Sequence, residues 1–383
     1  MEELRFRDGK FRIMLVGDPH GSAEDRTRVE RDKLHDYQLL QDTAVERLRP
    51  DLVVYMGDNA SGDTEEELHG ALRVVMAAAE KRGVPTATVV GNHDLQKKIS
   101  DMDVYTALVN RYDRSYFRRG DYCSEYGDYC VILRGEDGSP VMTLWFMYSG
   151  DKAPVGFPMG YGFVTKEQIE WYEKTAARIA ETNGSKPLPA MLFQHIPVVE
   201  EYALLKEVSP LSLLTNAVKG DGSRKGKYYV LNRGTGVTGY LGEAPCVPEY
   251  NSGQFESWKR TGDVFAAFFG HDHMNDFVGR VDGILLGQCK AAGFRIYGDG
   301  VRQGVRVIDV DEKDPGHIKT RMYSFRELCG IDNCRSVHGL IRHFPDRITT
   351  KVDMAFKVTP FITAGGCIAT VGTFLLLTRE RKK

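Results

Sequence analysis

Positive charge is not in excess in this sequence. Its 383 residues contain 51 Lys and Arg against 53 Asp and Glu, which gives a formal net charge of -2 at pH 7. A nucleic-acid-binding surface normally shows as a clear basic excess. The charge balance therefore argues against a nucleic acid as the partner.

Cysteine pairs of the kind that hold zinc are also absent. The seven cysteines are spread along the chain and no CxxC occurs, which argues against a zinc ribbon. Because seven is an odd number, the cysteines cannot all pair within one chain. We therefore expect reduced thiols in a cytosolic setting, with a bridge between Cys329 and Cys334, or between Cys123 and Cys130, left open.

The two ends of the sequence differ. The segment 1–12 is rich in charged residues, and the first apolar run, 13–16, has only the length of a strand. We therefore expect no secretory signal and a cytoplasmic location. Residues 360–378 contain no charged residue and precede a basic tail at 379–383, a length close to the roughly 20 apolar residues that cross a bilayer. The pattern predicts a membrane anchor or a packed helix at 358–378, after a catalytic domain at 1–325 and a linker at 326–357.

The first hundred residues alternate between strand and helix patterns. Short apolar runs predict strands at 11–16, 52–56 and 86–90, and apolar stripes predict helices at 34–49 and from Leu68 to Gly83. This alternation is typical of an α/β fold with a parallel sheet, in which ligands bind beyond the carboxyl ends of the strands.

The remaining pattern is less regular. Further strands are predicted at 131–133, 141–148, 190–193, 265–269, 284–286 and 305–310. Thr165 and Gln168 fit a capping box at the start of a helix that extends to about Ala180. The Gly- and Ser-rich segment 206–254 is predicted to be a long loop or insertion near the functional site.

Polar side chains follow five of the predicted strands. They are Asp18, His20, Asp58, Asn92, His195, His271 and His273. Residues two apart in an extended segment point to the same side, so His271 and His273 can face a common point. Carboxylate, imidazole and amide groups together suit Mn, Fe or Zn, and the lack of a thiolate argues against a structural zinc site. Seven side chains exceed one tetrahedral zinc but suit two ions if one carboxylate bridges them.

Each of these residues taken alone has an ordinary explanation. An Asp after a glycine is most often a turn residue or a helix cap, and a single His before Ile-Pro is most often a core residue. The case for a site depends on the joint pattern. Arg295 and Tyr297 could contact a substrate, but exposed strand positions are the simpler interpretation.

In this order, Asp-x-His, Gly-Asp-Asn, Gly-Asn-His-Asp, an isolated His and Gly-His-Asp-His resemble the five signature blocks of the calcineurin-like metallophosphoesterases. Residues 270–277 and 251–253 resemble the purple-acid-phosphatase-like branch of that family. The tyrosine ligand of true purple acid phosphatases is missing here, because Asn59, Ala60 and Ser61 follow Asp58. The resemblance implies a four-layer α/β sandwich, with two mixed β-sheets face to face and helices outside.

The resemblance also implies roles for individual residues. Asp18, His20 and His273 would hold one divalent metal, Asn92, His195 and His271 would hold the other, and Asp58 would bridge them. His93 would act on the scissile ester, and Asp94 and Asp272 would orient imidazoles. Two dications, two carboxylates and a bridging hydroxide leave a net charge of about +1, which favours a phosphate dianion.

The implied activity is hydrolysis of phosphomonoesters, either small molecules or phosphoproteins. A phosphodiesterase or nuclease on the same fold is one alternative. A binding scaffold that has lost its chemistry is another.

Overall fold

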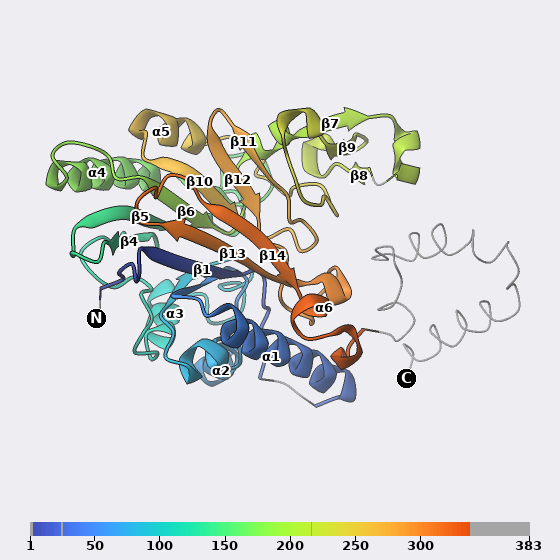
Figure 1. Cartoon of the computed structure of the whole chain (residues 1–383). Helices are drawn as coiled ribbons and strands as arrows, with labels where there is room; N and C mark the ends of the chain where they lie inside the picture. The colour runs from blue at the N-terminus through green and yellow to red at the C-terminus, as the bar shows by residue number, and fades with distance from the viewer. Residues whose placement is uncertain (1–2, 24–25, 216, 338–383) are drawn as a thin grey trace, which may run out of the picture.

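The computed structural model describes residues 3–23, 26–215 and 217–337, and two β-sheets lie face to face at its centre (Figure 1). Helices α1, α2 and α3 lie on the outer side of the first sheet, and α4 and α5 lie on the outer side of the second (Figure 1). This arrangement confirms the predicted four-layer α/β sandwich.

The first sheet has the strand order β14-β13-β1-β2-β3. Its strands are β1 (Lys10–Val16), β2 (Leu52–Met56), β3 (Thr86–Val89), β13 (Gly304–Asp311) and β14 (Lys319–Ser324). β1, β2 and β3 run parallel, whereas β13 is antiparallel to β1 and to β14. Every residue of β2 is buried, as expected for a central parallel strand that is covered on both faces.

The second sheet has the strand order β11-β12-β10-β6-β5-β4. Its strands are β4 (Tyr129–Arg134), β5 (Pro140–Met147), β6 (Ala190–Gln194), β10 (Val264–Phe269), β11 (Val278–Val281) and β12 (Ile284–Gln288). The four inner strands are parallel, and the edge strands β4 and β11 are antiparallel to their neighbours.

Alternate residues of the second sheet face two different cores. Phe193 and Phe268 belong to the core between the sheets, and their rings stack with centroids 6.1 Å apart. Their neighbours Leu192 and Phe269 belong to the core beneath the outer helices, together with Trp258 of α5. This period of two explains why β10 is apolar along its whole length.

The helices begin at residues that satisfy their free backbone donors. α1 (Arg28–Leu48) begins well before the predicted start at Leu34, because Thr27 and Glu30 form a capping box. The predicted box of Thr165 and Gln168 is present at the start of α4. The helices are α1, α2 (Glu65–Lys81), α3 (Met102–Val109), α4 (Lys166–Thr182), α5 (Gln254–Thr261) and α6 (Phe325–Leu328).

The segment predicted as a long loop has secondary structure of its own. It contains β7 (Leu205–Val208), β8 (Val218–Lys219) and β9 (Tyr228–Leu231), which form a separate three-stranded sheet. These strands are too short, and β7 too polar, to produce a strand signal. Short 3-10 turns lie at Val199–Leu204, Pro210–Thr215, Gly222–Arg224, Arg233–Thr235, Gly300–Arg302 and Ile331–Asn333.

The described chain remains packed beyond residue 325. Leu328 and Cys334 are part of the central core, and the buried Asp36 of α1 accepts bonds from the backbone N–H groups of Arg335 and Ser336. The proposed domain limits stay predictions, and the predicted anchor at 358–378 lies outside the described residues. Within the described residues, no helix has the length and apolar character to cross a membrane. None of the six cysteines described there is in a disulfide bond.

Candidate metal centre

The predicted ligands come together where the two sheets meet at the carboxyl ends of their strands. Asp18 follows β1, Asp58 follows β2 and Asn92 follows β3, all in the first sheet. His195 follows β6 and His271 follows β10 in the second sheet. Because the parallel strands of each sheet end at one edge, and the sheets lie face to face, side chains from distant parts of the sequence share one site.

The donor atoms form two groups that share one carboxylate. Asp18, His20, Asp58 and His273 have ligand atoms within 4.8 Å of one another, and so do Asp58, His195 and His271. The side-chain oxygen of Asn92 lies 3.0 Å from Nε2 of His195 and so joins the second group. We call the first group the outer position and the second, with Asn92, the inner position.

Distances within the groups suit ligands of a common ion. Nε2 of His195 lies 3.3 Å from Oδ1 of Asp58, and Nε2 of His20 lies 3.4 Å from Oδ2 of Asp58. Nε2 of His273 lies 3.7 Å from Oδ1 of Asp18. Ligand atoms about 2.1 Å from a tetrahedral ion are themselves about 3.4 Å apart, so the carboxylate of Asp58 is placed to bridge two ions.

The backbone is strained at four of these residues. Asp18, His20, Asp58 and His271 have φ angles of 42°, 43°, 50° and 71°, and they are four of the nine non-glycine residues with positive φ in the described parts of the chain. Such conformations are costly for residues with a Cβ, and they concentrate at functional sites. Gly57 adds a close contact, because a Cβ there would lie 2.4 Å from Nδ1 of His195.

Two of the histidines are oriented by backbone carbonyl groups. Nδ1–H of His195 donates to Met56 O at 2.9 Å, and Nδ1–H of His273 donates to Tyr297 O at 3.1 Å. Because a carbonyl only accepts, Nδ1 carries a proton in both rings, and Nε2 is the nitrogen directed toward the candidate cation positions.

The other two histidines each have a buried nitrogen without a partner. Nε2 of His20 and Nε2 of His271 are buried and make no hydrogen bond. A buried polar atom without a partner is costly in a native protein, unless it binds an ion or water. One such atom belongs to the outer position and one to the inner, so both donor groups fit a bound cation.

The electrostatics of the centre also favour cations. Burial lowers the pKa of His20 to about 4 and that of His273 to about 3, which keeps both imidazoles neutral, as metal ligands must be. Burial also opposes charge on His195, but the carboxylates of Asp58 and Asp18 raise its pKa to about 10. In the protein alone, a proton on His195 therefore supplies the positive charge that the buried carboxylates require, and a metal ion would displace it.

His93 lies beside the donor groups rather than within them. Its side chain is half exposed, and its Nε2 is 4.0 Å from Oδ2 of Asp58. Its Nδ1 is 2.7 Å from Oε1 of Gln96, whose amide donates to Asp151 at 2.5 Å. These contacts hold the imidazole with Nε2 toward the cation positions, where a substrate would lie.

Asp94 and Asp272 have contacts other than the imidazoles expected for them. Asp94 accepts from the backbone N–H groups of Gly91 and Ala60 and thereby ties two ligand loops together. Asp272 accepts from the backbone of Cys246 and from the side-chain amide of Gln288. Within the described residues neither carboxylate bonds to an imidazole, so both position loops instead.

The sequence pattern missed one residue beside the centre, Tyr161, and assigned two others, Arg295 and Tyr297, to a strand. The ring of Tyr161 meets the ring of His271 edge-on, with centroids 4.5 Å apart. Arg295 and Tyr297 lie in the loop between β12 and β13 rather than in a strand, and the ring of Tyr297 lies tilted against that of His273, with centroids 4.3 Å apart. Tyr161 had no local signal, because its place depends on contacts between distant segments.

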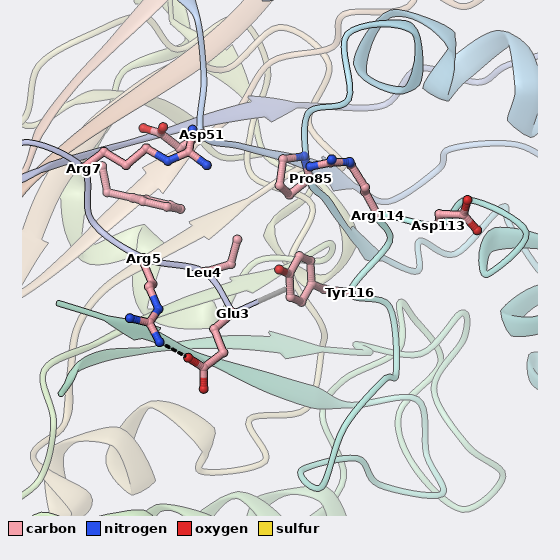
Figure 2. Close-up of a pocket in the computed structure, with 10 residues that line it drawn as sticks. Glu3, Leu4, Arg5, Arg7, Asp51, Pro85, Asp113, Arg114 and Tyr116 are labelled. Atoms are coloured by element: carbon pink, nitrogen blue, oxygen red, sulfur yellow. Dashed lines mark hydrogen bonds and ion pairs between the residues drawn. The ribbon is translucent and has the colours of Figure 1, made fainter. Parts of the chain in front are cut away.

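Two cavities lie at opposite ends of the strands. A cavity of about 420 Å³ is lined by His20, Asp58 and His93 and opens beside the outer position. Another, of about 230 Å³, lies where Asp51 and Pro85 precede β2 and β3 (Figure 2). Its lining residues include no histidine or cysteine, whereas His20 and Asp58 of the outer position line the first cavity.

Comparisons with known proteins agree with this geometry. Two Arabidopsis thaliana proteins named "Probable inactive purple acid phosphatase 14" and "Probable inactive purple acid phosphatase 28" are 27% and 28% identical over 340 and 321 residues. These alignments cover 80% and 77% of this chain, and 77% and 74% of the two plant proteins.

Among solved structures, a dimetal phosphatase from Danio rerio is 15% identical with a TM-score of 0.46, covering 82% of this chain and 99% of its own. A purple acid phosphatase from yellow lupin is 12% identical with a TM-score of 0.43, and the alignment covers 87% of this chain and 57% of the lupin chain. The calcineurin-like phosphoesterase family matches residues 11–275 of this sequence. The chain therefore belongs to the calcineurin-like phosphoesterase family.

Proposed function

We propose that this protein is a metal-dependent hydrolase of phosphoric monoesters. The observation that carries the proposal is the pair of donor groups joined by Asp58, each with a buried imidazole nitrogen that makes no hydrogen bond. All seven ligands of the family pattern are present and close together. Mn, Fe and Zn all suit this set of carboxylate, imidazole and amide donors.

Two divalent cations held there would polarise a phosphoryl group and activate a water molecule near neutral pH. Asp58 would serve both positions, and the carboxylate of Asp18 is itself held by the backbone N–H of His271 at 3.1 Å. The protein thus supplies a preorganised centre that needs little rearrangement when a phosphate dianion arrives.

His93 is the group that can handle a proton at the ester. Its Nδ1–H donates to Gln96, so its Nε2 faces the cavity, either as an acceptor or, in the imidazolium form, as a donor. The imidazolium could stabilise a phosphoryl oxygen or protonate the departing alkoxide. Gln96 and Asp151 keep the ring in this orientation.

A non-catalytic binding scaffold is the second candidate. The names of the plant relatives describe those proteins as inactive, and that observation favours it. Against it, loss of catalysis in such a centre would normally accompany loss of ligands, and here the ligand set is complete.

One experiment separates the candidates. The purified chain is supplied with Mn, Fe or Zn, its metal content is measured, and hydrolysis of p-nitrophenyl phosphate and of bis(p-nitrophenyl) phosphate is followed. We expect about two ions per chain and preferred hydrolysis of the monoester. Fewer than about one ion per chain and no hydrolysis would favour the scaffold, and preference for the bis-ester would indicate a phosphodiesterase.

A further inference from the structure

Arg295 is held against the loop that carries two of the candidate ligands. The backbone N–H of Ala292 donates to Gly17 O at 2.7 Å, and a Cβ on Gly293 would lie only 2.3 Å from Pro19 O. Only a glycine at 293 allows this approach. On the other side, Nζ of Lys33 donates to Arg295 O at 3.0 Å, so the backbone of Arg295 is fixed beside the outer position.

The side chain of Arg295 lines the cavity that opens onto the centre. The same cavity of about 420 Å³ is lined by His20, Asp58 and His93 at the centre, and by Lys97 further along the loop after His93. Its volume falls in the range of small-molecule sites, which is about 300–1,000 Å³. Ser22 and Ser61 also line it, as do two acidic residues, Asp63 and Glu67. The carboxylate of Glu67 already accepts from the backbone N–H of Asp63 at 2.9 Å. A polar group of small-molecule size would fit beyond the ester.

Arg295 and Lys97 have no ion-pair partner within the described parts of the chain, although both lie beside a site for two dications. Glu30 acts on Arg295 through space, but its carboxylate is already bound to the backbone N–H of Thr27 at 2.8 Å. Positively charged side chains beside a metal site repel the bound metal ions, unless an anion lies between them. This arrangement is expected where the ligand itself brings negative charge.

We propose that Arg295, assisted by Lys97, binds a second anionic group on the leaving-group side of the substrate. The preferred substrates would then be small phosphomonoesters whose alcohol also carries a carboxylate or a second phosphate. With the ester at the two cation positions and its leaving oxygen near His93, the rest of the alcohol extends toward Arg295. The planar guanidinium can bind two oxygens of such a group at once. This inference rests on the proposed function, since it assigns the substrate class of the same site.

A matched pair of esters tests the inference. Glycerol 3-phosphate and 3-phosphoglycerate both release a primary alcohol, but only the second carries a carboxylate. For the full chain loaded with Mn²⁺, we expect kcat/KM to favour 3-phosphoglycerate by about tenfold, the usual effect of one charge-assisted contact. Arg295→Gln should reduce this ratio to below about twofold, and Lys97→Gln, at a more exposed position, should reduce it to about threefold.

Lys98→Gln is the matched control. Lys98 is exposed and does not line the cavity, so this variant should keep the wild-type ratio. Equal kcat/KM for the two esters, or a ratio that Arg295→Gln and Lys97→Gln both leave intact, would overturn the inference without touching the proposed hydrolase function.

Binding measurements separate the inference from the proposed function. Calorimetric titration of the same two compounds into the metal-loaded chain should show a Kd about tenfold lower for 3-phosphoglycerate, and Arg295→Gln should remove the difference. If this binding preference appears without turnover, the anion site stands and the hydrolase proposal falls. If neither turnover nor a binding preference appears, both proposals fall.

Discussion

The two cation positions share Asp58 but differ in their surroundings. The outer position borders the large cavity, which His20 and Asp58 both line. Apart from the shared Asp58, the inner position does not line that cavity: His195 is fully buried, Asn92 is nearly so, and the partly exposed His271 has the ring of Tyr161 against it. Each position nevertheless has one histidine oriented by a backbone carbonyl and one with a free buried nitrogen.

This difference suggests a division of work within the centre. A ligand can reach the outer position through the cavity, where His93 and Arg295 are also placed. The inner position is set by the contact of the two sheets, since His195 comes from one sheet and bonds to Met56 and Asn92 of the other. We therefore expect changes at the inner position to affect the fold as well as the metal, and changes at the outer position to affect mainly the chemistry.

The largest effect is expected at the residue that belongs to both positions. Asp58→Asn removes the shared charge, so both ions should bind more weakly. Mutation of a residue that only orients a metal ligand lowers metal affinity by about 10–100-fold, and we expect a larger loss here. Metal analysis and the rate on p-nitrophenyl phosphate would show it. Asp63→Asn is the matched control, because Asp63 lines the same cavity but is exposed and outside both donor groups. Loss of only one ion in Asp58→Asn would contradict the bridging role.

The next largest effect is expected at His93, where a substitution should change the rate of hydrolysis and not the binding of metal. His93→Ala should slow turnover by about 100-fold or more, the usual contribution of a positioned acid or base. Its metal content should stay near that of the wild type, because Nε2 of His93 lies outside both donor groups. If the variant lost its metal, His93 would have to be reassigned as a ligand. Gln96→Ala should show a weaker form of the same defect, because Gln96 orients the ring.

A pair of histidine substitutions compares the two positions directly. In metal-free protein, His195→Ala should lower the free energy of unfolding by about 1–3 kcal/mol, because it leaves Met56 O without its donor in a fully buried site. His273→Ala should cost less, because the carbonyl that would lose its donor belongs to Tyr297, an exposed residue. Urea unfolding in the presence of a chelator measures both, and equal losses would remove the proposed difference between the positions.

The part of the centre that could be predicted is the part that depends on local pattern. Buried parallel strands are continuous apolar runs, and Asp18, Asp58 and His271 each follow such a run within a few residues. Arg295 and Tyr297 could not be placed in this way, because the loop that carries them is positioned by its contact with Gly17 and Pro19, far away in sequence. The small sheet of β7, β8 and β9 escaped prediction because its strands have no long apolar run.

The smallest effect on the metals is expected at a residue behind the loop that supplies one histidine to each position. Glu201 is fully buried. The side-chain amide of Gln288 donates to Glu201 at 2.8 Å and to Asp272, the residue between His271 and His273, at 3.0 Å. Burial raises the pKa of Glu201 to about 8. The folded state therefore holds a proton that the unfolded chain releases near its ordinary pKa of about 4.5. Stability from this group is complete below that pH and is lost as the pH rises toward 8.

Glu201→Gln keeps the shape of the side chain and removes the titration. The wild type should lose stability, on the order of a few kcal/mol, between pH 5 and pH 8.5, and the variant should lose less over the same range. Melting temperatures at the two pH values measure this, with Glu200→Gln as the control at a less buried neighbouring position. Since Glu201 lies behind both histidines, the ratio of the two bound metals should not change. A selective loss of one ion would show that the loop supports the two positions unequally.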